Sequence, residues 1–238
     1  MIGISKLYCG TVEPSDALRY GRQSKEMPSH LLQFSADKKP VVVWNITRKC
    51  NLKCVHCYAH ATDEAAKEEL STEEGKQLLD DLADFGTPVV LFSGGEPLVR
   101  KDLVELADYA VKRGMRAVIS TNGTLISRSV AQALKEVGLS YVGISLDGMR
   151  EVNDRFRGVK GSFDRAMAGI KHCQEAGIKV GLRFTINRMN AAEIPAIFDL
   201  LEERDIPRVC FYHLVYTGRG SDLIEEDLSH EETRRVVD

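Results

Sequence analysis

The chain has 238 residues, of which 43% are hydrophobic and 28% are charged, so it is long enough to bury a core of ordinary domain size. Its formal net charge is -3 and no block of like charges stands out, which excludes the basic footprint of a nucleic-acid-binding protein and a basic helix for a membrane surface. The sequence does not begin like a signal peptide and has no apolar run of the about 18 residues that span a bilayer, which indicates a cytoplasmic protein.

From about residue 40 the sequence alternates short apolar runs with helical patterns. Strands are predicted at 41–47, 88–93, 115–121, 141–147, 179–186 and 208–215, and helices at 71–86, 101–114, 127–138, 162–177 and 191–205. The first helix opens with a capping box, Ser71 to Glu74. Apolar strands separated by crossover helices predict a parallel sheet, either a partial barrel or a doubly wound sheet, with ligands at the carboxyl ends of the strands.

The chain divides into three parts on this pattern. Residues 1–39 form an N-terminal extension with little core of its own, residues 40–220 form the main domain, and residues 221–238 begin a C-terminal region. A second capping box, Ser229 to Glu232, predicts a helix with six further residues before the chain stops. We therefore expect the chain to be a piece of a longer protein.

Three of the six cysteines fall within eight residues, at Cys50, Cys54 and Cys57, in a loop after the first strand. Thiolates gathered in one loop select zinc or an iron–sulfur cluster. Three cysteines would leave one iron of a four-iron cluster open to a substrate or cofactor. The alternative is structural zinc with His56 or His60 as the fourth ligand. The scattered cysteines are interpreted as small core residues: Cys9, Cys173 and Cys210.

Polar residues and glycine follow each of the next three strands. The carboxyl ends of parallel strands lie at one rim of the sheet, so these segments would lie close together. The segments are Ser93-Gly94-Gly95-Glu96-Pro97, Ser120-Thr121-Asn122-Gly123 and Ser145-Leu146-Asp147-Gly148. The paired glycines would let the backbone approach a ligand and leave amides free to donate, and Glu96 would accept from a cationic group. One such strand end is an ordinary turn, but three beside a metal loop indicate a binding site.

The Cys-x-x-x-Cys-x-x-Cys loop and the Gly-Gly-Glu-Pro segment together resemble the radical S-adenosylmethionine (SAM) superfamily, over about residues 40–215. The resemblance implies an α/β fold, a partial (β/α)6 TIM-like barrel. It also implies a [4Fe-4S] cluster on the three cysteines, with SAM chelating the fourth iron. A ferredoxin- or flavodoxin-type donor would then reduce the cluster, and SAM cleavage would give a deoxyadenosyl radical. No catalytic residue is expected beyond the cluster and SAM.

The cofactor-binding residues expected from this resemblance are Tyr58, Gly94, Gly95, Glu96, Thr121, Asn122, Ser145, Asp147 and Arg157. Gly94, Gly95 and Glu96 would hold the SAM amino group, and Tyr58 would flank the adenine. The other residues would line the strand ends, with Arg157 at a carboxylate. For Asp147 and Arg157 the alternative is a surface charge or a helix-start residue.

The stretch MIGISKLYCGTVEPSDALRYGR, followed by the cysteine loop, resembles the radical SAM proteins of alternative, siroheme-dependent haem biosynthesis. This implies a modified iron tetrapyrrole as substrate, with acetate side chains removed from didecarboxysiroheme to give Fe-coproporphyrin III. Relatives in the group act in haem d1 formation. The segment Tyr216–Gly220 also resembles the group, and Arg219 would meet a substrate carboxylate unless it is a turn residue in solvent.

Members of this group usually continue into a cysteine-rich C-terminal region that can bind an auxiliary [4Fe-4S] cluster, and no such region follows within these 238 residues. Two other functions remain open. One is a peptide-modifying radical SAM maturase of the SPASM type, which shares the same core. The other is a zinc-stabilised binding module without catalysis.

Overall fold

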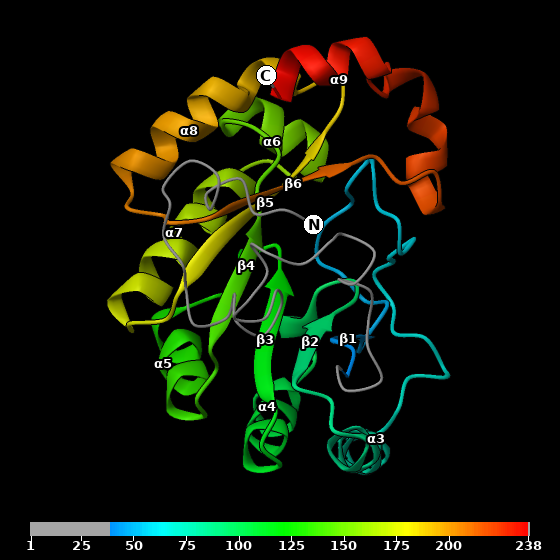
Figure 1. The fold of residues 1–238 in the computed structure, drawn as a ribbon, viewed down its shortest axis with the longest axis vertical. Helices are drawn as coiled ribbons and strands as arrows, with labels where there is room; N and C mark the ends of the chain where they lie inside the picture. The colour runs from blue at the N-terminus through cyan, green and yellow to red at the C-terminus, as the bar shows by residue number, and fades with distance from the viewer. Residues whose placement is uncertain (1–38, 238) are drawn as a thin grey trace, which may run out of the picture.

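The computed structural model describes residues 39–237, so the predictions for the N-terminal extension, including Cys9, lie outside the described residues. The described part contains six strands: β1 (Val42–Asn45), β2 (Val89–Ser93), β3 (Arg116–Thr121), β4 (Tyr141–Ser145), β5 (Val180–Ile186) and β6 (Val209–His213). All neighbouring pairs are parallel, in the order β1-β2-β3-β4-β5-β6. A doubly wound sheet reverses its strand order in the middle, and this one does not. The partial barrel is therefore confirmed (Figure 1).

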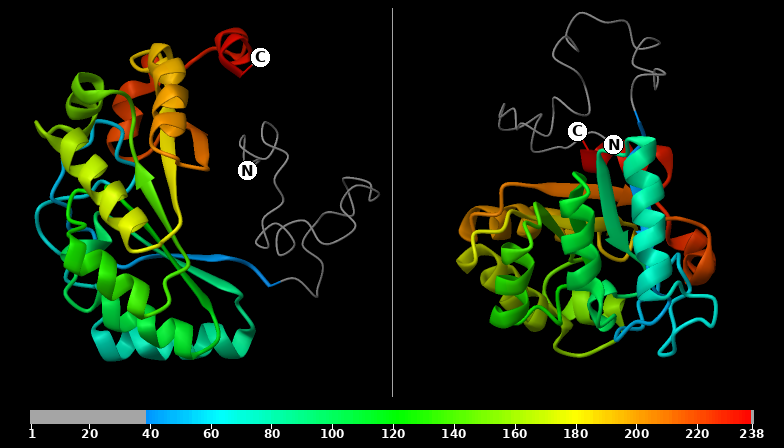
Figure 2. Two further views of the ribbon diagram at one scale, coloured as in Figure 1. Left: turned by 90° about the vertical axis from the view of Figure 1, so that its left-hand side faces the viewer. Right: turned by 90° about the horizontal axis from the view of Figure 1, so that it is seen from below.

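Helices alternate with these strands. They are α3 (Thr72–Phe85), α4 (Leu103–Lys112), α5 (Arg128–Glu136), α6 (Arg150–Arg157), α7 (Ser162–Glu175), α8 (Ile194–Glu203) and α9 (His230–Val237), with 3-10 segments η2 (Pro97–Val99), η3 (Ala191–Glu193) and η4 (Gly218–Glu226). The side views show helices on the outer side of the curved sheet (Figure 2). The capping box of α3 is confirmed, because Ser71 N donates to Glu74 Oε2 at 2.8 Å and Glu74 N donates to Ser71 Oγ at 3.3 Å. Helix α6 was not predicted.

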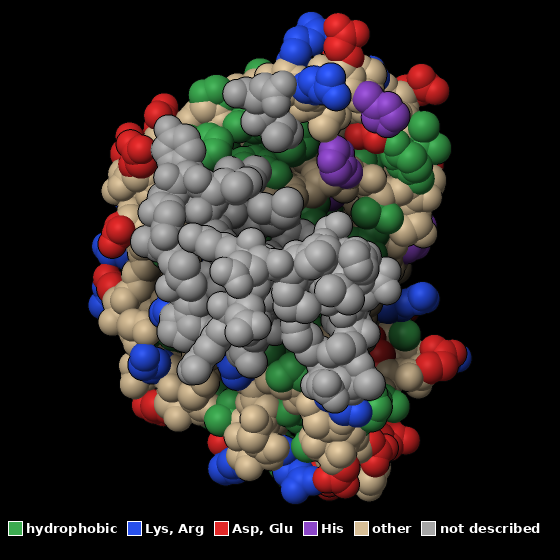
Figure 3. Space-filling view, viewed as in Figure 1, with side chains coloured by type: hydrophobic (Ala, Val, Ile, Leu, Met, Phe, Trp, Pro, Cys, Tyr) green, Lys and Arg blue, Asp and Glu red, His purple; other side chains and the backbone are tan. Residues whose placement is uncertain are grey.

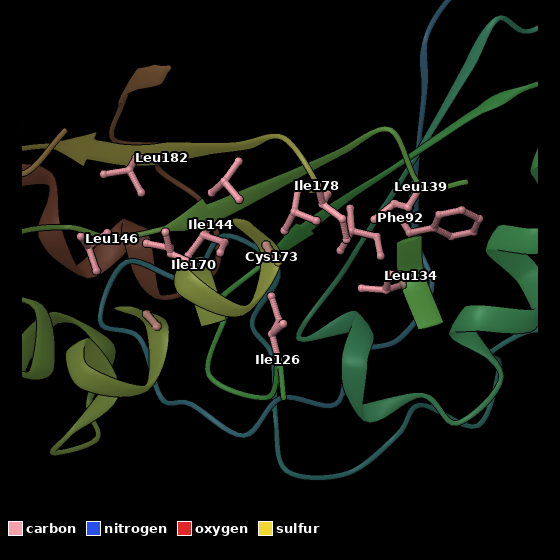
Figure 4. Close-up of a cluster of buried hydrophobic side chains, with 14 of the residues drawn as sticks. Phe92, Ile126, Leu134, Leu139, Ile144, Leu146, Ile170, Cys173, Ile178 and Leu182 are labelled. Carbon is pink, nitrogen blue, oxygen red and sulfur yellow. The ribbon is translucent and has the colours of Figure 1, made fainter. Parts of the chain in front are cut away.

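The hydrophobic core lies between the sheet and this outer layer of helices. Strand side chains alternate between two faces, and on β4 and β5 the residues facing the helices are fully or almost fully buried: Val142, Ile144, Val180, Leu182 and Phe184. Helix α7 packs Ile170 and Cys173 against them (Figure 4). The interpretation of Cys173 as a core residue is therefore confirmed.

The opposite, concave face carries the alternate residues of the same strands. On β4 and β5 these are Tyr141, Gly143, Ser145, Gly181, Arg183 and Thr185. Cys210 of β6 lies on this face too, half-buried, because its neighbour Phe211 packs outward against Phe184. Where the described surface is visible in Figure 3, charged side chains lie mainly around its outer edge and hydrophobic ones nearer its centre.

The last described segment is attached to the barrel. Segment η4 crosses the boundary predicted at residue 220, and α9 begins after the predicted capping box, in which Ser229 N donates to Glu232 Oε2 at 2.7 Å. Arg188, in the loop after β5, pairs with Glu232 at 2.8 Å. Among the described residues, no helix has the length and apolar character needed to cross a membrane.

Candidate active site

The four polar loops predicted to bind a ligand meet at one rim, because the strands that carry them run parallel and side by side. The cysteine loop follows β1 and the Gly-Gly-Glu segment follows β2. Thr121 ends β3 and Asn122 comes directly after it, and Ser145 ends β4. Hydrogen bonds between these loops, rather than ladder bonds of the sheet, set the geometry of the rim.

The cysteine loop rests on the C-terminal end of α6. Lys53 N donates to Arg157 O at 3.1 Å, and Val55 N donates to Phe156 O at 2.9 Å. Gly158, which ends the helix with φ +68°, touches the loop so closely that a Cβ there would lie 2.5 Å from Lys53 O. The helix missing from the sequence prediction is thus the support of the metal loop.

Two of the cysteine thiols are perturbed by their surroundings. Burial raises the pKa of Cys50 to about 11, and the nearby charges of Cys54, Glu96 and Cys57 act in the same direction. Burial also raises the pKa of Cys54, against the effect of the Arg157 guanidinium, whose Nη1 lies 3.6 Å from the sulfur. A metal that binds these two cysteines therefore has to displace protons.

The Gly-Gly-Glu segment packs against the start of the cysteine loop. Gly95 N donates to Thr47 O at 2.8 Å, and Glu96 N donates to Lys49 O at 2.9 Å. The expectation of free amides is therefore wrong for Gly95 and Glu96. A Cβ at Gly94, which has φ +131°, would overlap Thr47 O, and one at Gly95 would overlap Lys49 O. Glycine is required here so that two loop backbones can touch.

The Glu96 carboxylate is fully buried and is already hydrogen-bonded within the chain. Thr121 Oγ1 donates to it at 2.7 Å, Asn122 N at 2.8 Å and Leu98 N at 3.0 Å. The sequence interpretation as an open acceptor is corrected to this extent, because three of its about four acceptor positions are occupied. Burial raises the pKa of Glu96. The side-chain amide of Asn122 also reaches Cys50 Sγ at 4.0 Å, so Asn122 connects the end of β3 with the metal loop.

Asp147 and Arg157 form a buried pair beside Cys54. Asp147 is 0% exposed, accepts from Thr185 N at 2.8 Å and pairs with the Arg157 guanidinium. The alternative that these two residues are surface charges is therefore wrong. His56 Nε2 lies 3.3 Å from the same carboxylate, and burial lowers the pKa of His56 to about 4, so its ring is neutral at pH 7.

Arg219 holds the cysteine loop from a distant part of the chain. Its Nε donates to Cys54 O at 2.8 Å, its Nη1 to Ala61 O at 2.9 Å, and its backbone N to Cys57 O at 3.0 Å. The neighbouring Gly218 is in contact with Cys57 O, which leaves no room for a Cβ. These contacts show that Arg219 is not a turn residue free in solvent, and the substrate contact expected for it stays a prediction.

Replacing Arg219 with alanine should loosen the cysteine loop without unfolding the barrel. Two charge-assisted hydrogen bonds are lost, so we expect amide hydrogen exchange in residues 50–62 to become roughly tenfold faster or more. Arg188→Ala is the matched control, because Arg188 binds Glu232 and Glu225 in the same C-terminal segment but does not touch the loop. Unchanged exchange in the Arg219 variant would show that these contacts do not hold the loop.

The remaining predicted residues are placed as follows. Tyr58 is 47% exposed, with its hydroxyl 3.5 Å from Asn45 Oδ1. His60, one candidate zinc ligand, is exposed and has φ +48°. Within residues 39–237 no three His, Cys, Asp or Glu side chains are gathered closely enough to hold a single metal ion.

The donor set around the loop fits an anionic iron–sulfur cluster. Three thiols supply the ligands that such clusters use. Two arginines stand beside them, and Arg157 Nε and Arg219 Nη2 are buried without a hydrogen-bond partner in the described structure. Buried, unpaired guanidinium nitrogens favour a negatively charged neighbour.

Comparison with known proteins agrees with this geometry. The family model of the radical SAM superfamily matches residues 44–201. Over all 238 residues the chain is 75% identical to the Fe-coproporphyrin III synthase of Methanosarcina barkeri and covers 60% of it. It is 44% identical over 200 residues to the pre-heme d1 synthase of Dinoroseobacter shibae, covering 84% of this chain and 50% of that protein.

A solved structure shares the fold. Streptococcus suis SuiB bound to precursor peptide SuiA matches with a TM-score of 0.71 at 23% identity, over 82% of this chain and 44% of SuiB. The chain thus spans 50% to 60% of the length of the two relatives named above.

Proposed function

Because the chain belongs to the radical SAM superfamily, we propose that Cys50, Cys54 and Cys57 hold a [4Fe-4S] cluster and that the adjoining rim binds SAM. When bound and reduced by one electron, these two groups would supply radical chemistry that can take hydrogen from an unactivated carbon. The observation that supports this site is the contact between the cysteine loop and the Gly-Gly-Glu segment, which brings the two halves of the motif together.

The residues of the chain would bind, orient and shield these groups. Gly94, Gly95 and Glu96 would receive the SAM amino group, for which the Glu96 carboxylate keeps about one acceptor position. Arg157, which is buried, and Arg219, whose Nη2 atom is buried, would offset the negative charge of the thiolates.

The rest of the rim would hold the other parts of SAM. We assign Thr121 and Asn122 to the side next to Glu96, Ser145 and Asp147 to the methionine or ribose part, and Tyr58 to the adenine. The tight packing of Asp147 against Thr185 and Arg157 supports a fixed rather than a mobile surface there.

For the whole protein we propose removal of acetate side chains from didecarboxysiroheme to give Fe-coproporphyrin III. The supporting observation is the 75% identity to the Fe-coproporphyrin III synthase over all 238 residues, against 44% over 200 residues to the pre-heme d1 synthase. A haem d1 function is therefore the second candidate. A ferredoxin- or flavodoxin-type donor would reduce the cluster, and an auxiliary cluster would belong to the remaining length of the protein.

Anaerobic turnover tests this proposal. The full-length protein with didecarboxysiroheme, SAM and a reductant should give Fe-coproporphyrin III by mass spectrometry, together with deoxyadenosine. Omitting SAM should stop both products. Deoxyadenosine without side-chain loss would reject the substrate and keep the SAM site, whereas neither product from a cluster-loaded sample would reject both.

A further inference from the structure

The concave face of the barrel holds a half-buried cation that the SAM site does not use. Arg183 lies in the middle of β5, in register with Ser145 of β4. Its side chain crosses to β4 and lies over Gly143, where a Cβ would overlap the Nε atom. The missing side chain at Gly143 is therefore what makes room for the guanidinium.

This guanidinium lacks a partner within the described structure. Its Nε is buried and has no hydrogen-bond partner there, and none of the ion pairs formed by residues 39–237 includes Arg183. The other two arginines at the rim, Arg157 and Arg219, do contact a carboxylate or carbonyl groups. A buried donor without a partner is costly, so an arginine kept in this state points to an anion that lies outside the described residues.

Tyr141 adds a second donor group to the concave face beside Arg183. Tyr141 of β4 crosses to β5 above Gly181, where its hydroxyl leaves no room for a Cβ. The Arg208 guanidinium lies over the Tyr141 ring, 5.7 Å from its centroid. Burial raises the pKa of Tyr141 to about 12, so its hydroxyl stays a neutral donor. Arg183 and Tyr141 thus offer charged and neutral donors on the same face.

We propose that Arg183, whose guanidinium lies over Gly143, binds a carboxylate side chain of the substrate. The proposal rests on the proposed function, because it assigns the ligand of Arg183 to a ring that carries several carboxylates. A planar guanidinium with parallel N–H groups matches a carboxylate in a bidentate way. The backbone amide of Thr185 binds Asp147 at the rim, and Arg183 lies two residues before Thr185 on β5. The substrate carboxylate would therefore lie about 7 Å from the rim, toward the start of the strands.

Binding of Fe-coproporphyrin III to the reconstituted holoenzyme, followed by absorbance, tests the proposal without turnover. Arg183→Gln should raise the dissociation constant roughly tenfold to a hundredfold, and Arg183→Lys should raise it less. Gly143→Ala, which displaces the guanidinium but keeps the charge, should also weaken binding. The matched control is Arg128→Gln, an exposed arginine at the start of α5 on the outer layer. SAM affinity and iron content should not change in any of these variants.

A ligand with blocked carboxylates separates the outcomes. The tetramethyl ester of the same porphyrin should bind wild type and Arg183→Gln equally. Wild-type affinity of Arg183→Gln for the free acid would overturn the assignment of Arg183 alone. Lost SAM affinity in this variant would overturn it in favour of a cofactor contact. If the wild-type enzyme did not bind Fe-coproporphyrin III, the proposed function and the assignment that rests on it would both fall.

Discussion

Replacing Cys50, Cys54 and Cys57 together with alanine in the 238-residue chain should remove the iron of the proposed cluster and abolish reductive cleavage of SAM. The three sulfurs are the ligands of the proposed cluster, and no other described cysteine can replace them, since Cys173 is buried behind the sheet and Cys210 lies on β6. The loss of the cluster is measured by iron and sulfide analysis and by the broad absorbance at about 400 nm that iron–sulfur proteins show. The loss of SAM cleavage is measured by deoxyadenosine formation.

The control for this triple variant is Cys173→Ala. Cys173 is 0% exposed in the α7 core, so its loss should lower the melting temperature but leave iron content and SAM cleavage intact. A colourless wild-type protein with one zinc per chain would instead support the zinc-stabilised module. Deoxyadenosine formed by the triple variant would contradict the assignment of the cluster to these cysteines.

The fold could be predicted from the sequence because the patterns that indicate its strands and helices are local. The strands are apolar runs bounded by turns, and α3 has both halves of its capping box within Ser71 to Glu74. Helix α6 was not predicted because its eight residues are mainly polar. Only Asn153, Phe156 and Arg157 are buried, which is too few to give a recognisable helical period. Its one local signal is Gly158, directly after the last turn.

Which residues meet at the rim could be predicted from the sequence, but the hydrogen bonds between them could not. Polar residues after consecutive parallel strands had to meet at one rim. Two of the three partners of the Glu96 carboxylate lie 25 and 26 positions further along the chain, and those of the Arg219 side chain lie 158 and 165 positions back. No local pattern encodes contacts at such separations. The sequence therefore did not predict that the Glu96 carboxylate is largely occupied or that Arg219 holds the metal loop.

The contact between the two loops leads to the second large effect. Gly95→Ala should displace the cysteine loop, because the added Cβ would lie 2.7 Å from Arg48 O and overlap Lys49 O. Both obstacles are backbone atoms, so no side-chain rotation can relieve them, and overpacking of this kind costs about 1–3 kcal/mol. We expect iron content after reconstitution to fall well below that of the wild type and the dissociation constant for SAM to rise about tenfold or more.

Gly114→Ala separates this effect from general backbone strain. Gly114 has φ +85° and nothing within 4 Å of an added Cβ, so alanine there strains the turn after α4 without touching the site. That variant should lose stability and keep its iron and its SAM affinity. Gly95 has no left-handed φ, so alanine there should not strain its own backbone. Gly95→Ala should therefore lose iron and SAM affinity while the barrel stays folded. Wild-type iron content and SAM affinity in Gly95→Ala would mean that the close approach of the two loops does not form the binding site.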